Sequence, residues 1–91
     1  MANVLVETDP SPMKLEILNV DDWPIKTLPC GPVSQTNSGT EMHYIIEGAG
    51  EITSDDGAHI TFVAGDMITV MPDTTCTWNI TESVEKHSSI G

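Results

Sequence analysis

The sequence predicts an all-β domain, a small antiparallel sandwich or barrel. Its 91 residues suffice for one hydrophobic core and are too few for two. From residue 13 onward, roughly eight short apolar runs are separated by turn residues about every 8–12 positions, a spacing typical of sandwiches and barrels. No window sustains a helical period of apolar residues. A closed barrel is favoured because closure leaves few strand edges exposed.

The N-terminal residues 1–12 are expected to be a flexible arm or a strand exchanged with a second copy, and residues 13–91 the domain itself. An aliphatic run at residues 4–6 suits a strand that pairs with a sheet edge, and two prolines separate it from the domain. The segment carries no basic residue, so no secretory signal peptide is predicted and we expect a cytoplasmic protein.

Turn residues divide the rest of the chain into short strands, which we expect at residues 15–18, 28–35, 40–47, 51–53, 59–63, 67–71, 76–80 and 84–90. The run at 28–35 contains two prolines and a glycine, which favours an irregular or edge strand. The segment Gly48-Ala49-Gly50 predicts a tight hairpin connection. Asp56-Gly57 predicts a second hairpin, since Asp-Gly is a strong turn signal. Further turns are expected at residues 64–66 and 72–73.

The charge of the chain excludes several classes of partner. Fourteen acidic residues against three basic ones give a net charge of -11, which repels the phosphates of nucleic acids and anionic membrane surfaces. No apolar stretch approaches the length of a membrane span. The two cysteines show no CxxC spacing, and free thiols fit a reducing compartment. We therefore expect a small-molecule ligand, with neither nucleic acid nor membrane as a partner.

Three segments together resemble the cupin superfamily. The stretch EMHYIIEGAGEI at residues 41–52 is similar to the cupin strand in which Glu precedes Tyr-hydrophobic-hydrophobic-x-Gly by three positions. The Asp56-Gly57 turn followed by VAGD at 63–66 matches the cupin linking turn and Ala-Gly-Asp corner. Residues 72–78 stand where the second cupin motif would lie. The resemblance implies a small single-domain cupin, which is a double-stranded β-helix or jelly-roll barrel.

A closer resemblance is to short single-domain cupins grouped with ureidoglycine aminohydrolase. The chain shares with them DWPI at residues 22–25, CTW at 76–78 and a terminal stretch similar to VEKH at 84–87. The resemblance covers residues 14–90 and implies a small, nitrogen-containing ligand such as a ureide. Fold is fixed by such a resemblance far better than activity, because one fold hosts many chemistries.

In metal-binding cupins the first motif supplies two histidines and the Glu, and the second motif supplies a third histidine. The resemblance places these histidine positions at Gln35, Asn37 and Cys76, so all three are altered. Strand alternation puts His43 on the same face as Glu41. Glu41 and His43, with Gln35 or Asn37 as a third ligand, would form an alternative site for Zn²⁺, Mn²⁺ or Fe²⁺. Whether the chain binds any metal is left open.

Glu41, His43 and Lys86 are the candidate catalytic residues. A carboxylate that faces a barrel interior needs a cation, donors or a proton, which makes Glu41 a candidate acid–base; the alternative is a solvated rim carboxylate. Neutral imidazole is a common base, although His43 also suits a polar wall. Lys86 shares one face of its strand with Val84, Ser88 and Ile90, so it would point inward and pair with Glu41. The alternative is a solvent-facing lysine, since lysine is usually exposed.

Cys76 and Trp78 are expected to face the same pocket, together with Gln35 and Asn37. Trp78 would stack on a planar ligand or fill the core, and Cys76 would act as a small hydrophobe. On the face opposite Glu41, Tyr44 and Ile46 would supply a surface for a homodimer.

Three functions remain open from the sequence, and the third of them is a purely structural interaction domain whose barrel is filled. The first is a cupin that binds or transforms a small nitrogen-containing metabolite by proton transfer, with or without a metal. The second is a non-catalytic module without metal, which binds a metabolite or another protein.

Overall fold

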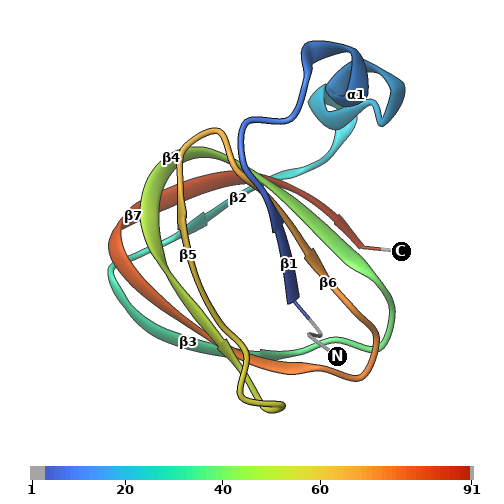
Figure 1. Ribbon diagram of the computed structural model, residues 1–91. Helices are drawn as coiled ribbons and strands as arrows, with labels where there is room; N and C mark the ends of the chain where they lie inside the picture. Colours follow the sequence, from blue (N-terminus) through green and yellow to red (C-terminus); the bar gives the residue numbers. More distant parts are fainter. Residues whose placement is uncertain (1–3, 91) are drawn as a thin grey trace.

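The structure, a computed structural model, describes residues 4–90, apart from the side chain of Ile90. One antiparallel sheet of seven strands curls into a barrel around a single core, as Figure 1 shows. The strands are β1 Val4–Glu7, β2 Ile25–Leu28, β3 Gly31–Thr36, β4 Glu41–Ser54, β5 His59–Val63, β6 Met67–Val70 and β7 Thr75–Ile90. This architecture confirms the predicted all-β barrel.

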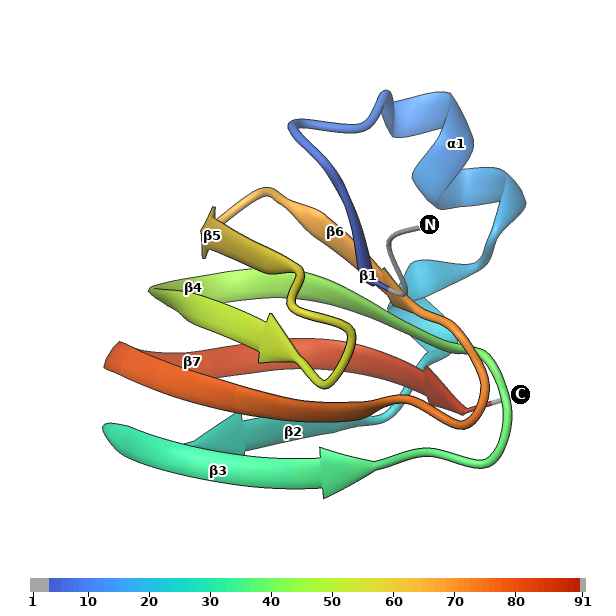
Figure 2. The same ribbon diagram turned by 60° about the horizontal axis from the view of Figure 1, so that its bottom comes forward.

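The two longest strands, β4 and β7, hold the curled sheet together because each pairs with several partners. The first part of β4 pairs with β6 and its second part with β5, while its whole length runs beside β7. In turn β7 pairs with β3 through residues 75–80 and with β2 through residues 84–87. Figure 2 shows the resulting stack of β5, β4, β7 and β3 from the side.

The predicted hairpin at Gly48-Ala49-Gly50 is wrong, because the chain continues through it as β4. The register against β7 shifts at three places between Ile45 and Gly50, so these glycines form bulges that bend the strand. The expected strands at 76–80 and 84–90 are likewise one continuous strand, β7. By contrast, the hairpin at Asp56-Gly57 is confirmed, as are the strands at 59–63 and 67–71 within a residue of their ends.

The expected strand at residues 15–18 is also wrong, since this segment belongs to helix α1, Pro12–Ile17. Ser11 caps the helix by accepting a hydrogen bond from the Lys14 amide, and Pro12 occupies its first turn. A six-residue helix is too short to show a period in the sequence. A single 3₁₀ turn, η1 Val20–Asp22, follows it. Residues 28–35 contain the end of β2 and most of β3, separated at Pro29 and Cys30.

The N-terminal segment runs along the barrel of its own chain. Strand β1 pairs with β6 from Val4 opposite Val70 to Glu7 opposite Met67, and the Val4 side chain is buried in the core. Exchange of this strand with a second copy stays a prediction, and residues 1–3 and 91 lie outside the described part. Tyr44 and Ile46 are half-buried, and their use in a homodimer also stays a prediction. No helix among residues 4–90 is long and apolar enough to cross a membrane.

The core combines an apolar centre with a polar end. Its buried apolar residues come from five strands and include Val4, Ile45, Ile52, Phe62, Ile68, Val70, Trp78, Ile80 and Val84. Along the inward faces of β4 and β7, this pattern gives way to His43, Lys86 and Ser88, which are each 2% exposed. Polar groups are buried only where partners or a ligand satisfy them, so this end of the barrel is where a site is expected.

Candidate functional site

A cavity of ≈ 300 Å³ opens at the polar end of the barrel. Side chains from four strands line it: Lys26 of β2, Gln35 and Thr36 of β3, Glu41 and His43 of β4, and Lys86 of β7. Alternation along β4 turns Glu41, His43 and Ile45 to the same side, which explains how one strand supplies two of the polar groups. The structure thus brings together four of the residues predicted from the sequence: Gln35, Glu41, His43 and Lys86.

His43 lies at the centre of a hydrogen-bonded chain. Its Nδ1 is 3.1 Å from Lys86 Nζ and 2.8 Å from Ser88 Oγ, and its Nε2 is 3.1 Å from Glu41 Oε1. An ammonium group only donates, so Nδ1 accepts and the ring proton is assigned to Nε2, which donates to the carboxylate. Both ring nitrogens of His43 are therefore used, and the imidazole connects the amine to Glu41.

Burial and two lysines keep this imidazole neutral. Desolvation, followed by the positive charges of Lys86 and Lys26, lowers the pKa of His43 from 6.5 to about 3. Protonation of His43 would add a positive charge beside those of Lys86 and Lys26, on a side chain that is only 2% exposed. At neutral pH His43 therefore serves as a hydrogen-bond relay and a proton acceptor of low basicity.

Lys86 is buried without a carboxylate at ion-pair distance among the described residues. Its Nζ lies 4.3 Å from the centroid of the Trp78 ring, which supplies a cation–π contact. Burial lowers the pKa of Lys86 from 10.5 to about 8, an effect that Glu41 opposes and Lys26 increases. The amine is therefore held in the barrel wall by an imidazole and an aromatic face.

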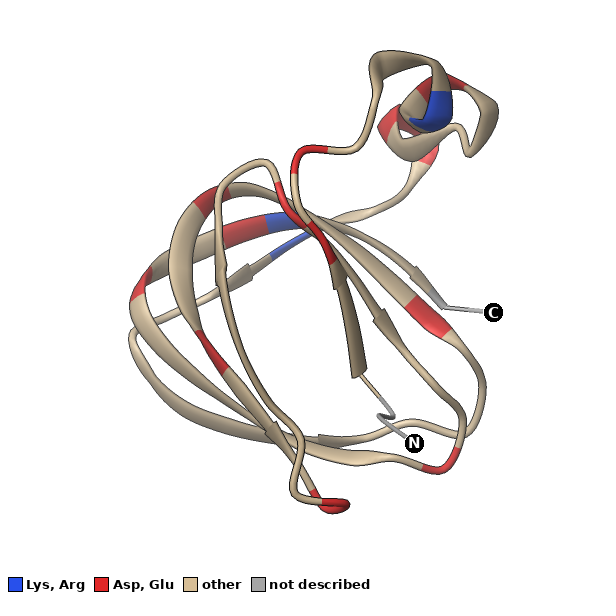
Figure 3. Cartoon of the chain, viewed as in Figure 1, with Lys and Arg blue, Asp and Glu red and all other residues tan. Residues whose placement is uncertain are grey.

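The second lysine of the cavity lies directly beside the first. Lys26 of β2 and Lys86 of β7 are opposite each other in the antiparallel register, and both line the cavity. Like charges in such a pair repel. Figure 3 shows the two basic positions side by side, on a barrel whose other charged residues are mostly acidic. Lys14, the third lysine, lies on α1 and pairs with Glu7.

Trp78 and Cys76 lie in the core beneath the cavity and do not line it. The Trp78 ring meets His43 edge-on at 5.0 Å and Phe62 at 5.6 Å, so it supports the His43–Lys86 pair from below. Cys76 is 2% exposed, and burial together with nearby carboxylates raises the pKa of its thiol to about 11. A thiol of this kind is inert, so Cys76 packs as a small hydrophobe.

Asn37 was expected in the pocket but braces two loops instead. Its side-chain nitrogen donates to the carbonyl oxygens of Gly39 at 2.6 Å and Met71 at 2.8 Å, and its backbone pairs with Asp73 and Thr74. An amide held in this way cannot turn toward Glu41. The structure adds Lys26, Thr36 and Ser88 to the predicted residues, and only Ser88 had a signal in the sequence, namely its shared face with Lys86.

The residues at this site do not fit a catalytic metal. Glu41 and His43 are only two strong metal ligands. In the described part of the chain, no group of three His, Cys, Asp or Glu side chains is suited to hold a metal ion. Lys86 and Ser88 occupy Nδ1 of His43, while Nε2 carries the proton donated to Glu41. A divalent cation there would also face two lysines. We therefore derive no step that uses a metal.

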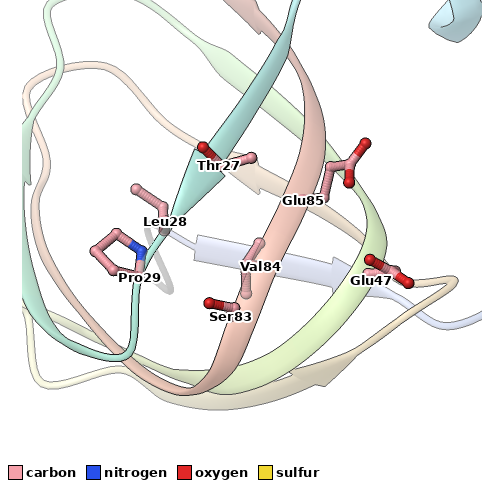
Figure 4. Close-up of a pocket in the computed structure, with 7 residues that line it drawn as sticks. All are labelled: Thr27, Leu28, Pro29, Glu47, Ser83, Val84 and Glu85. Atoms are coloured by element: carbon pink, nitrogen blue, oxygen red, sulfur yellow. The ribbon is translucent and has the colours of Figure 1, made fainter.

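A second hollow of ≈ 280 Å³ lies between β2, β7 and β4, and Figure 4 shows its lining. Glu47 and Glu85, which are opposite each other in the register, are its only ionisable side chains. The others are Thr27, Leu28, Pro29, Ser83 and Val84. None of the residues predicted for the site lines this second hollow. The first cavity is therefore the candidate functional site.

Comparison with known proteins agrees with this architecture. The family described as EutQ-like cupin domain matches residues 15–87. A DUF861 family protein from Thermotoga maritima has 33% sequence identity and a TM-score of 0.91, covering 97% of this chain and 99% of the other. A DUF1255 protein of unknown function from Acidithiobacillus ferrooxidans has 14% identity and a TM-score of 0.67, covering 69% and 60%, and shows a similar fold alone. No curated protein matches the chain.

Proposed function

The chain belongs to the EutQ-like cupin family, and on that premise we propose that it binds a small nitrogen-containing metabolite that carries a carboxylate. One observation carries the proposal. Among residues 4–90, neither Lys26 nor Lys86 has an acidic side chain at ion-pair distance, and the two lie side by side in a cavity that also presents Glu41 and a neutral His43. An anionic group would relieve the repulsion between the lysines, and Glu41 would accept from an N–H group.

The size and polarity of the cavity support a ligand of this kind. A hollow of ≈ 300 Å³ lies at the lower end of the range for small-molecule sites, about 300–1,000 Å³. The ligand carboxylate would lie between Lys26 and Lys86, and its nitrogen would face Glu41 and Gln35. Electrostatic attraction in a partly buried cavity is stronger than in water, so the cationic pair selects acids over their neutral analogues.

A ureido acid is the finer form of the proposal. The sequence resemblance to the ureidoglycine aminohydrolase group suggests it, and such a molecule has both a carboxylate and N–H donors. The chemistry that we propose is proton transfer, in which Glu41 takes a proton from the bound nitrogen or from water. His43 connects Glu41 to Lys86, so the same proton can move along the chain of hydrogen bonds.

The test uses N-carbamoylglycine as the ureido acid and its amide as the neutral comparator, with affinity measured by calorimetry. We expect the acid to bind and the amide to bind at least tenfold more weakly. Glu41→Gln and Lys26→Met should each weaken binding of the acid roughly 10–100-fold, the value of one charge-assisted hydrogen bond.

Matched controls come from the surface of the same chain. Glu51→Gln alters the exposed His59–Glu51 pair, and Lys14→Met removes a lysine that lies on α1. Both should leave the affinity within about twofold. Equal binding of the acid and the amide would contradict the proposal, as would equal losses from the control and cavity variants.

The second candidate is the non-catalytic module, in which the polar side chains of the cavity bind a metabolite without transforming it. Prolonged incubation of the protein with N-carbamoylglycine, followed by NMR, separates the two. Conversion that Glu41→Gln abolishes supports proton-transfer catalysis, whereas tight binding without conversion supports the module.

A further inference from the structure

The amine of Lys86 is placed as a nucleophile would be placed. Its side chain is 2% exposed, yet it lines the cavity, and no carboxylate holds it at ion-pair distance in the described part of the chain. A structural lysine in a protein core is normally paired with an acid, because an isolated buried charge is costly. Here its polar partner is Nδ1 of His43, at 3.1 Å.

The hydrogen-bonded chain gives the ammonium proton a way out. Lys86 Nζ donates to His43 Nδ1, and His43 Nε2 donates to Glu41 Oε1. Transfer along these two bonds leaves a neutral amine, an imidazole in its other tautomer and a protonated Glu41. Imidazole suits this step because one ring nitrogen can accept a proton while the other releases one.

We propose that Lys86 forms an imine with the carbonyl carbon of a small 2-oxo acid bound in the cavity. The inference rests on the proposed function in one respect, namely that small carboxylates enter this cavity. Lys26, directly opposite Lys86 in the register, would hold the carboxylate next to the carbonyl group. Desolvated lysines beside a second cation are a general solution for activating an amine, and the cavity provides both conditions.

The reaction balances without any further reagent. The neutral amine attacks the carbonyl carbon, an N–C bond forms, and a proton moves from nitrogen to oxygen to give a carbinolamine. The C–O bond then breaks as protonated Glu41 returns a proton, so the oxygen leaves as water and a protonated imine remains. One ammonium and one carbonyl thus give one protonated imine and one water. Glu41 is again a carboxylate, and His43 stays neutral with its proton on Nδ1 until hydrolysis of the imine reverses the steps.

The acidity of the amine supports this role. A pKa of about 8 for Lys86, lowered chiefly by burial, makes a substantial fraction of the amine neutral near pH 7.5. A lysine with the ordinary pKa of about 10.4 would be neutral on the order of 100-fold less often at that pH. Because lower basicity also reduces nucleophilicity, the expected rate advantage is nearer tenfold.

The experiment traps the imine by reduction. The protein is incubated with pyruvate and cyanoborohydride at pH 7.5, and peptide mapping by mass spectrometry gives the rate of adduct formation at each amine. We expect Lys86 to react at least about tenfold faster than Lys14 in the same molecule, a comparison that requires no variant. Lys14→Met should leave the Lys86 rate unchanged, and Lys86→Arg, which keeps the charge, should abolish the fast adduct.

Binding measured in parallel separates failure of this inference from failure of the proposed function. Pyruvate and N-carbamoylglycine are each titrated by calorimetry without reductant. Saturable pyruvate binding with no faster adduct at Lys86 overturns the imine and leaves the proposed binding function standing. Adducts at equal rates on Lys14, Lys26 and Lys86 overturn it as well. Failure of both acids to bind contradicts the proposed function itself.

Discussion

At the scale of single residues, His43 takes its chemistry from its surroundings. The imidazole would titrate near pH 6.5 in an unfolded chain, but burial and the two cavity lysines hold its pKa at about 3 in the barrel. An unfolded chain therefore binds a proton between pH 6.5 and pH 3 that the folded chain does not bind. The same argument that makes His43 a neutral relay makes the protein sensitive to acid.

We predict that His43 contributes to acid unfolding. Its contribution to stability is complete above pH 6.5 and decreases as the pH falls toward 3, because protons bind preferentially to the unfolded chain across that window. The expected loss is on the order of 3 kcal/mol in the free energy of unfolding. Denaturant titrations at several pH values should show this part of the slope in the wild type and not in His43→Gln.

The control for this prediction is His59, which is exposed and contacts Glu51 at 3.3 Å. His59→Gln should follow the wild-type pH dependence. If His43→Gln and the wild type lose stability in parallel from pH 6.5 to pH 3, His43 is not kept neutral by the fold.

Single residues also show how far the sequence could predict this site. The strict alternation of β4 and β7 placed His43, Lys86 and Glu41 on inward faces, and the structure brings them together. Asn37 was expected in the pocket from the spacing of the cupin motif, but β3 ends at Thr36 and Asn37 lies in the loop that follows. The cavity position of Lys26 had no sequence signal, since it depends on a pairing with Lys86 sixty residues away.

At the scale of elements, strand β4 depends on glycines at its bend. Gly48 has a φ of 100°, and a Cβ there would lie 2.4 Å from the backbone oxygen of Ser83 and 2.8 Å from Cα of Val84. The glycine therefore lets the backbones of β4 and β7 approach closely where the sheet curls. Such a contact, between positions far apart in the chain, is why the sequence pattern alone suggested a hairpin here.

We predict that Gly48→Ala is strongly destabilising. The methyl group meets backbone atoms that cannot move without breaking the β4–β7 pairing, and the positive φ adds its own strain. The expected cost is about 3 kcal/mol or more in the free energy of unfolding. Gly57→Ala is the matched control, because Gly57 has a φ of 91° but no neighbouring atom within 4 Å.

The control isolates the close approach from the backbone conformation. Gly57→Ala should cost about 1–2 kcal/mol, the strain of a left-handed residue alone. Chemical denaturation of both variants measures the difference. Equal losses would mean that the contact with β7 at Gly48 contributes nothing beyond its φ.

At the scale of the whole molecule, the surface is strongly acidic, whereas the fold places two lysines together at one cavity. The protein measures 32 × 26 × 20 Å and has a net charge of -11, yet two of its three lysines lie together at one cavity. The composition predicted repulsion of polyanions, and the barrel was predicted from turn spacing and the cupin motifs. Neither the composition nor the motifs could show that Lys26 and Lys86 lie together, because their proximity depends on the register between β2 and β7.

This arrangement predicts an unusual effect of salt on ligand association. A small anion approaching from a distance meets a repulsive field, whereas the attraction of the lysines acts only near the cavity. At 0.01 M salt the Debye length of about 30 Å spans the whole molecule, and at 0.15 M it falls to about 8 Å. Salt should therefore remove the long-range repulsion first, and the association rate constant of N-carbamoylglycine should rise a few-fold over this range.

Stopped-flow fluorescence can measure this rate, because Trp78 lies against His43 and beneath the Lys86 amine. A Trp23→Phe background leaves Trp78 as the only indole. The neutral amide should show no dependence on salt, which separates the field of the protein from changes in its structure. A rate that falls as salt increases would mean that the cavity lysines dominate even at long range. The acidic surface would then have no part in selecting ligands.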